Sequence, residues 1–454
     1  MPKTHKTKGD DLVNAFDVLP DAWPAVAEVG KVAHAIGAFY GFEGMYVSPV
    51  ESAAWFNALV RSGMLDDRPP VWCRARTGED LLLSPSVALG VMRAYVSQRM
   101  HALPHPLKIV AEGDAFSLSV PGRNQAHTES KAIEESAQSE PSPMIVRREW
   151  ALVMIGEGGL VAETEIIQVL WKTCAELGLT HDAVELRINA TGCVHCRSSY
   201  RTALGGYFRS RLARLCTASK RDLKSNPTHI LSCPDERCRG LGMSAPQILD
   251  FLCERCKKQL RGLLEFLDSA NIPYFLDSAL FREGTWLGEI IFAITLRPRD
   301  DAGIPPAESA RLVVCAEGGR ASRAAQVLGG KEMSVVAGTL FLDVVAQSIR
   351  ARSGAQIPAL DAFFVQLGDL AKRRSFEILE SLREGGIMVK ESLGRDSIKI
   401  QLKIAEHLGA RYALVLGQKE ALDATIIVRE VHSGAQETVP QERLVEFVKK
   451  KLKK

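Results

Sequence analysis

Cysteine is the residue type in this chain whose spacing most clearly suggests chemistry. The 454 residues include ten cysteines, and seven of them lie between Cys193 and Cys256. The two thiolates of a C-x-x-C pair can reach one tetrahedral zinc ion at about 2.3 Å, and two pairs complete a closed, structural site. The predicted zinc ligands are two such pairs, with two single cysteines as competing or additional ligands: Cys193 and Cys196, Cys253 and Cys256, then Cys233 and Cys238.

The alternative to a metal site is a set of buried thiols, because free cysteine is common in protein cores. Disulfides are not expected, since the polar N-terminus lacks the apolar stretch of a signal peptide and predicts a protein of the reducing cytoplasm. The longest apolar stretches, such as 150–156, are too short to span a bilayer, so no membrane partner is expected.

Basic and polar side chains gather near the C-terminus and could contact nucleic acid. The net charge is only +3, so such a surface must be local. Lys399 and Lys403 share one face of a helix predicted over 397–408, where they suit phosphate contacts. A solvated helix face is the alternative. The candidate nucleic-acid-contacting residues are Arg395, Lys399, Gln401, Lys403 and Arg411.

The elements that carry these side chains divide the chain into two or three domains, as its length also suggests. Residues 118–146 are polar and predict a mobile loop. The cysteine-rich region over 198–270 has a mainly helical pattern. Helices are predicted over 25–40, 87–96 and 162–177, and strands over 45–50, 81–83, 107–111, 149–156, 186–189, 273–276, 289–296 and 311–316.

Strands and helices alternate after Pro358, which predicts a separate α/β domain. Apolar strands that alternate with helices are typical of a parallel or mixed sheet covered by helices. A polar connector is predicted earlier in the chain, over 299–310, directly before the strand at 311–316. The strands are predicted over 363–367, 387–390, 412–416 and 425–431, and the helices over 371–384 and 397–408.

The stretch 391–417, ESLGRDSIKIQLKIAEHLGARYALVLG, resembles the anticodon-binding domain of histidyl-tRNA synthetases. That domain typically shows a glycine turn, a helix with Gln-Leu-Lys, and Leu-Gly-Ala-Arg-Tyr leading into a buried strand. The matching residues are Gly394, Gln401, Leu402, Lys403, Ala405, Leu408, Gly409, Ala410, Arg411, Tyr412 and Gly417.

The resemblance extends to the rest of the chain and implies its fold. The segments LRINATGCVHCRSSYRTAL and APQILDFLCERC resemble the cysteine-rich helical insertion of some bacterial histidyl-tRNA synthetases. Where such relatives have a further cysteine pair after Leu215, this chain has Cys216 followed by Thr217-Ala218-Ser219. The implied fold is an α+β class II synthetase-like core, an antiparallel sheet with helices, interrupted by a helical inserted domain and followed by a C-terminal α/β anticodon-binding domain. The implied boundaries are 1–185 and 271–355 for the core, 186–270 for the insertion and 358–454 for the last domain.

The catalytic motifs of the family are altered in this chain. Ser84 and Ser86 stand where the family has arginine and a substrate-binding glutamate, and Ser117 and Val344 replace two arginines that contact ATP. The arginines that remain near family positions are Arg282, a remnant catalytic and substrate-binding candidate, and Arg320, an ATP- or substrate-binding candidate. The segment 40–51 resembles the motif that builds the family's dimer.

The resemblance implies a cytoplasmic homodimer that binds tRNA, with neither DNA nor a membrane as partner. An active chain would attach histidine to tRNA with ATP and Mg²⁺, beside structural Zn²⁺. The first alternative is a catalytically inactive tRNA-binding paralogue, a sensor or accessory subunit. A second alternative is a regulatory subunit in histidine biosynthesis, which the retained anticodon-binding domain argues against.

Overall fold

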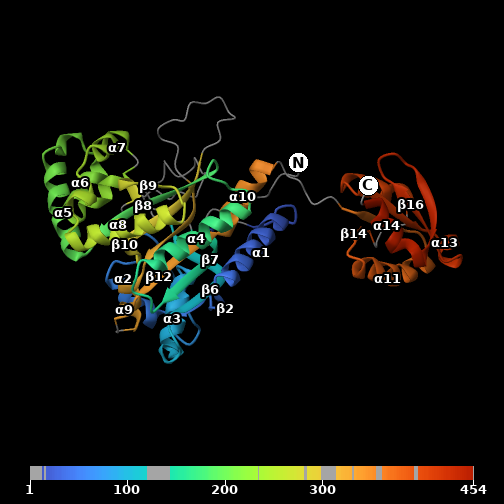
Figure 1. Ribbon diagram of the computed structural model, residues 1–454, viewed down its shortest axis with the longest axis horizontal. Coiled ribbons are helices and arrows are strands. Elements are labelled where there is room, and N and C mark those ends of the chain that lie inside the picture. The colour runs from blue at the N-terminus through green and yellow to red at the C-terminus, as the bar shows by residue number, and fades with distance from the viewer. Residues whose placement is uncertain are drawn as a thin grey trace. The chain divides into compact units, whose positions relative to one another are not determined.

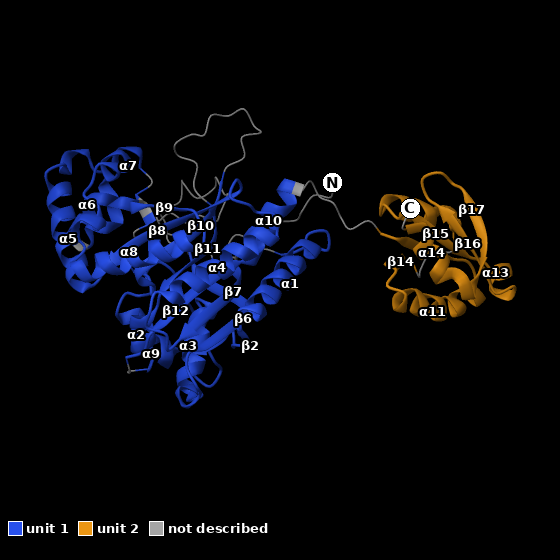
Figure 2. Ribbon diagram, viewed as in Figure 1, with its two compact units in different colours: residues 1–353 blue, residues 354–454 orange. Residues whose placement is uncertain are grey.

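The computed structural model divides the chain into two compact units, residues 1–353 and 354–454 (Figure 2). Most of the loop predicted over 118–146 and the connector over 299–310 lie outside the described residues, as do Arg282 and Arg395. The structure describes residues 13–14, 17–119, 144–233, 235–280, 284–297, 313–329, 332–353, 360–392 and 397–452.

The first unit is built on a nine-stranded sheet with the order β2-β6-β7-β12-β11-β10-β8-β9, and β1 pairs with β7. Its central strands are antiparallel, as expected for the core; the β2–β6, β8–β9 and β1–β7 pairs are parallel. The strands are β1 (Val13–Asn14), β2 (Glu43–Met45), β6 (Leu107–Leu118), β7 (Met144–Ile155), β8 (Val184–Gly192), β9 (Tyr274–Leu276), β10 (Gly288–Leu296), β11 (Val313–Arg320) and β12 (Val335–Phe341).

The two-residue period of β7 separates the two faces of this sheet. Trp150, Leu152 and Met154 pack with the helices of one face, where Gly37 approaches the Trp150 ring closely. Ala151 and Val153 belong to a different cluster on the other face. The helices of the first face are α1 (Trp23–Phe39), α4 (Val161–Glu176) and α10 (Leu342–Ser353) (Figure 1).

The second face is covered by a three-stranded antiparallel sheet, β3-β5-β4, and by short helices. The prediction of one strand over 45–50 is wrong, because β2 ends at Met45 and the chain forms β3 only from Val50. Pro49 lacks the backbone N–H that a continuous ladder would need. The elements are β3 (Val50–Ser52), β4 (Val71–Arg74), β5 (Asp80–Leu83), α2 (Ala53–Arg61), α3 (Val87–Ser97), η1 (Met100–Ala102) and α9 (Ser322–Gly329).

Residues between β8 and β9 form the helical insertion, whose α5, α6 and α7 lie together at one end of the first unit (Figure 1). Tyr200, Leu204 and Phe208 repeat at helical spacing and join the same buried cluster as Trp150. The core therefore continues from the sheet into the insertion. Its elements, and the short helix after β9, are α5 (Val194–Arg209), η2 (Leu212–Arg214), α6 (Thr217–Ser225), η3 (Pro227–Ser232), α7 (Glu236–Met243), η4 (Ile248–Phe251), α8 (Glu254–Ser269) and η5 (Ser278–Leu280).

The second unit is a mixed sheet with the order β14-β13-β15-β16-β17, parallel in its first three strands. Phe364 packs against α11 and α14, and Phe363 packs against α12 on the opposite face. The edge strand β17 carried no apolar signal, because Val439 is its single buried residue. The elements are β13 (Ala362–Gln366), α11 (Asp369–Glu384), β14 (Val389–Glu391), α12 (Ile398–His407), β15 (Tyr412–Leu416), α13 (Gln418–Leu422), β16 (Thr425–Glu430), β17 (Gln436–Pro440), η7 (Gln441–Arg443) and α14 (Leu444–Leu452). Among the helices that the structure describes, none combines the length and apolarity needed to cross a membrane.

Candidate functional site

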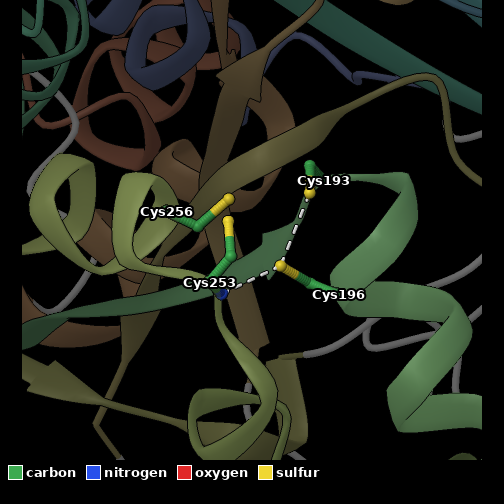
Figure 3. Close-up of side chains that lie close together, drawn as sticks. All are labelled: Cys193, Cys196, Cys253 and Cys256. Carbon is green, nitrogen blue, oxygen red and sulfur yellow. Dashed lines mark hydrogen bonds between the residues drawn. The ribbon is translucent and has the colours of Figure 1, made fainter.

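Two C-x-x-C pairs meet where the insertion leaves and rejoins the main sheet. Cys193 is the N-cap residue of α5 and Cys253 is that of α8, so each partner cysteine lies in the first turn of its helix. Gly192, with φ of +65°, turns the chain from β8 into α5, a backbone conformation that favours glycine. Figure 3 shows the four side chains converging from these two helix starts.

The four sulfur atoms have the mutual distances of a metal site. They lie within 4.8 Å of one another, and the Sγ atoms of Cys193 and Cys196 are 3.5 Å apart. Tetrahedral bonds of about 2.3 Å to zinc place sulfurs about 3.8 Å apart. The backbone N–H of Cys196 lowers the pKa of Cys193 to about 6, whereas burial raises the pKa of Cys256 to about 12. A bound cation would favour the thiolate form throughout, so the donor set fits zinc.

Cys233 and Cys238 do not compete for this first site. They lie instead with Cys216 in a second group of three sulfurs, all within 4.8 Å of one another. The sequence did not reveal this partition, because it depends on how η3 and α7 fold back onto α6. Cys216 was therefore missing from the predicted ligands, although its place in the same cysteine-rich segment was a usable signal.

The second face of the main sheet carries a buried network of charged side chains. Arg68 donates from Nη1 to Oε1 of Glu149 at 3.1 Å, and its Nη2 pairs with Glu317. The second oxygen of Glu149 accepts from the backbone N–H of Val87 at 2.9 Å and from Oγ of Ser86 at 3.2 Å. Burial nevertheless raises the pKa of Glu149, because Arg68 offsets only part of the loss of water. Sequence reasoning did not identify this network, whose charged residues are far apart in the chain.

Arg147 lies beside this network on β7. Its guanidinium carbon is 5.6 Å from the centre of the Phe341 ring, and that of Arg68 is 5.7 Å from the same centre. Burial, with a contribution from the neighbouring Arg68, lowers the pKa of Arg147 to about 10. Its Nε atom is buried and has no hydrogen-bond partner among the described residues. Arg147 thus brings a second buried guanidinium to this face.

The serines at the altered motif positions are all buried. Ser84 donates from Oγ to the carbonyl of Ser86 at 3.1 Å, and Ser86 in turn donates to Glu149. Ser117 lies on β6 opposite Ile145, and Val344 packs into the core from α10. Two of these three hydroxyls therefore satisfy groups of the protein itself.

Arg320, a predicted contact for ATP or substrate, is held by a buried partner. Its Nη2 lies 2.5 Å from Oε1 of Glu163, and its Nη1 donates to Oγ of Ser334 at 3.0 Å. Burial raises the pKa of Glu163, whereas Arg320 opposes that shift. These contacts fix the guanidinium at the end of β11. Arg282, the other predicted arginine, lies outside the described residues.

The structure separates the predicted RNA-contacting residues. Lys399 and Lys403 are exposed on α12. Gln401 is fully buried, and its amide accepts from the backbone N–H of Gln366 at 3.2 Å and donates to the Gln366 carbonyl at 2.9 Å. Its predicted role as a hydrogen-bonding contact for RNA is therefore corrected to the anchoring of α12 on β13. Arg411 is exposed and donates to the carbonyl of Leu452 at 3.2 Å. Arg395 lies outside the described residues.

Comparisons with known proteins find similar proteins for both units. Residues 363–451 match the anticodon binding domain family. The histidine–tRNA ligase of Dehalococcoides mccartyi is 25% identical over 441 residues, which cover 96% of this chain and 98% of that protein. The histidine–tRNA ligase of Desulforamulus reducens is 28% identical over 381 residues, 82% of this chain and 83% of that protein. The structure of apo S. aureus histidyl-tRNA synthetase matches with a TM-score of 0.68 at 22% identity, over 96% of this chain and 98% of that one.

Proposed function

We propose that this chain, a divergent member of the histidyl-tRNA synthetase family, binds tRNA through its C-terminal unit and does not carry out the family's ligation of histidine. The match of residues 363–451 to an anticodon binding domain supports the first part. The exposed Lys399 and Lys403 on α12 supply cations for phosphate contacts there. The internal ion pairs of the main sheet support the second part.

The single observation that carries the proposed loss of ligation is the burial of Glu149 in contacts with its own protein. Activation of an amino acid by ATP builds negative charge at the α-phosphate, which cations and hydrogen-bond donors must stabilise. Arg68, Ser86 and the N–H of Val87 are donors on the sheet face, and all three already bind Glu149. Loss of one transition-state donor typically lowers the rate by about 100- to 1000-fold.

The four-thiolate group of Cys193, Cys196, Cys253 and Cys256 is proposed to hold structural Zn²⁺. A closed site with four protein ligands leaves no position for a reacting water, so the ion would fix the starts of α5 and α8. We also propose a homodimer that forms through the segment 40–51. Phe39 and Tyr46, which flank or lie in this segment, are 84% and 81% exposed, a large apolar surface for a monomer to leave in water.

The test is histidine-dependent exchange of pyrophosphate into ATP by the zinc-loaded full chain with Mg²⁺, together with binding of a histidine tRNA transcript. We expect tRNA binding and no exchange above that of a histidine-free control. Ser117→Arg is a matched variant, because it restores a cation at one altered motif position. Clear exchange by the unaltered chain would overturn the proposed loss of activity, and absence of tRNA binding in folded protein would overturn the other half.

An active histidine–tRNA ligase is the second candidate function. The observation that favours it is that two relatives named histidine–tRNA ligase align over 96% and 82% of this chain. In that case ATP and Mg²⁺ would bind on the same sheet face, and the Arg68–Glu149 pair would have to open. The exchange measurement distinguishes the two candidates directly.

A further inference from the structure

Three helices of the insertion begin with the same arrangement of side chains. In each, a cysteine is the N-cap residue and a second side chain follows three positions later, in the first turn. The pairs are Cys193 and Cys196 on α5, Cys253 and Cys256 on α8, and Cys216 and Ser219 on α6. On α6, therefore, the hydroxyl of Ser219 occupies the position that the second sulfur of the pair has on α5 and α8.

The first turn of α6 directs both of its side chains toward two further cysteines. The sulfur of Cys216 is 3.7 Å from that of Cys233, and the backbone N–H of Cys216 donates to the sulfur of Cys238 at 3.3 Å. Cys238 lies in the first turn of α7 and is fully buried. Three sulfurs within 4.8 Å of one another, carried by three segments, make a compact and soft donor set.

Ser219 completes this group from its buried fourth side. The residue is fully buried, and its hydroxyl lies 3.3 Å from the sulfur of Cys216. The backbone N–H of Ser219 donates to Cys216 at 3.4 Å, as helix N-termini do for negatively charged groups. A hydroxyl and three sulfurs therefore face one small volume.

We propose that Cys216, Cys233 and Cys238 bind a second zinc ion, separate from the four-thiolate site, with the Ser219 hydroxyl at the fourth corner. Binding converts the three thiols to thiolates and releases their protons to solvent, and no oxidation or reduction is involved. Three thiolates with a neutral oxygen hold zinc less tightly than four thiolates do. The second ion therefore exchanges faster than the first and ties α6, η3 and α7 together only while it is bound.

The test is the number of zinc ions retained by the full chain, counted by native mass spectrometry after incubation with zinc and removal of the excess. We expect two ions in the unaltered chain and one in Cys238→Ser. Cys73→Ser is the matched control, because Cys73 is exposed on β4 and belongs to neither group; it should retain two. The rate of release to a zinc-binding dye should show one fast and one slow ion.

Ser219 provides a second test that does not remove a cysteine. Ser219→Cys should retain two ions and make the fast release slower, because it supplies a fourth thiolate. Ser219→Ala should release the second ion at least about tenfold faster, because it removes a ligand and the loss of a group that merely orients a ligand already has an effect of that size. A single ion in the unaltered chain would overturn the proposal, even if Ser219→Cys held two. Two ions in Cys238→Ser would overturn it as well.

Discussion

The guanidinium of Arg68 forms a buried ion pair with the carboxylate of Glu149 on the strand β7, with Nη1 and Oε1 3.1 Å apart. The side chain of Glu149 is fully buried and that of Arg68 is 10% exposed. The pair joins the segment before β4 to the centre of the main sheet. It therefore links the cover of the second face to the sheet beneath it.

Replacement of Arg68 should destabilise the first unit strongly. In Arg68→Met, Glu149 would remain buried without its cation, a change that typically costs about 3–5 kcal/mol. The measurement is urea unfolding followed by tryptophan fluorescence, because all six tryptophans lie before residue 354 and report on the first unit alone. Arg74→Met is the matched control: its pair with Asp80 is 72% and 56% exposed, so the change should cost less than about 1 kcal/mol. Equal effects of the two variants would contradict the inferred role of burial.

The cost of Arg68→Met should depend on pH with a defined sign. Burial already raises the pKa of Glu149 above its ordinary value, and removal of the cation raises that pKa further. In the variant, the proton bound to Glu149 in the folded state contributes stability that is fully present below the unfolded pKa of about 4.3. This stability is lost as pH rises through the higher pKa of the folded state. Unfolding curves at about pH 5 and about pH 8 should show the larger cost at the higher pH. A cost independent of pH would indicate that another group determines it.

Gly192→Ala should weaken the first zinc site. An added Cβ would lie 2.6 Å from Cβ of Cys196 and 3.2 Å from its sulfur, and φ of +65° disfavours any side chain there. Cys196 would have to shift, so we expect faster loss of the slowly released ion and a lower melting temperature. Gly206→Ala on α5 is the control, because its Cβ would meet nothing within 4 Å and alanine stabilises helices by up to about 1 kcal/mol. Unchanged zinc release in Gly192→Ala would contradict the assignment of Cys196 as a ligand.

Gln401→Leu should destabilise the second unit and leave the first unchanged. The variant removes both hydrogen bonds to the backbone of Gln366, and each buried group left unsatisfied costs about 1–3 kcal/mol. Hydrogen exchange should become faster at the amide of Gln366 and along β13. Tryptophan fluorescence, which reports on the first unit, provides the internal control. Normal protection of β13 in the variant would show that Gln401 does not anchor the helix.

How much of this arrangement could be predicted depends on how far apart the interacting residues lie along the sequence. The apolar run that starts at Trp150 and the helical spacing of Ile166 and Leu170 are local, and these patterns correctly predicted the second half of β7 and α4. The C-x-x-C spacing likewise brought Cys193 and Cys196 together as expected.

Contacts between distant residues could not be predicted in this way. Arg68 and Glu149 are 81 residues apart, and Gln366 and Gln401 are 35 apart. Gln401 is a polar residue between Lys399 and Lys403 on α12. Helical periodicity alone therefore does not predict that its side-chain amide hydrogen-bonds the backbone of β13. The separation of Cys233 and Cys238 from the first site has the same origin, since it depends on how the helices of the insertion pack.

Lys399→Ala and Lys403→Ala should each weaken tRNA binding without loss of stability. Both lysines are exposed on α12, where a phosphate contact would release counterions from the RNA. Each substitution should therefore reduce the slope of log affinity against log salt concentration by about 1 and weaken binding of different tRNAs to a similar extent. Lys31→Ala is a matched control, because Lys31 is an exposed helical lysine of the first unit, 78% accessible and near Glu28. If affinity and salt dependence were unchanged in both α12 variants, the RNA-binding surface of the second unit would have to lie away from this helix.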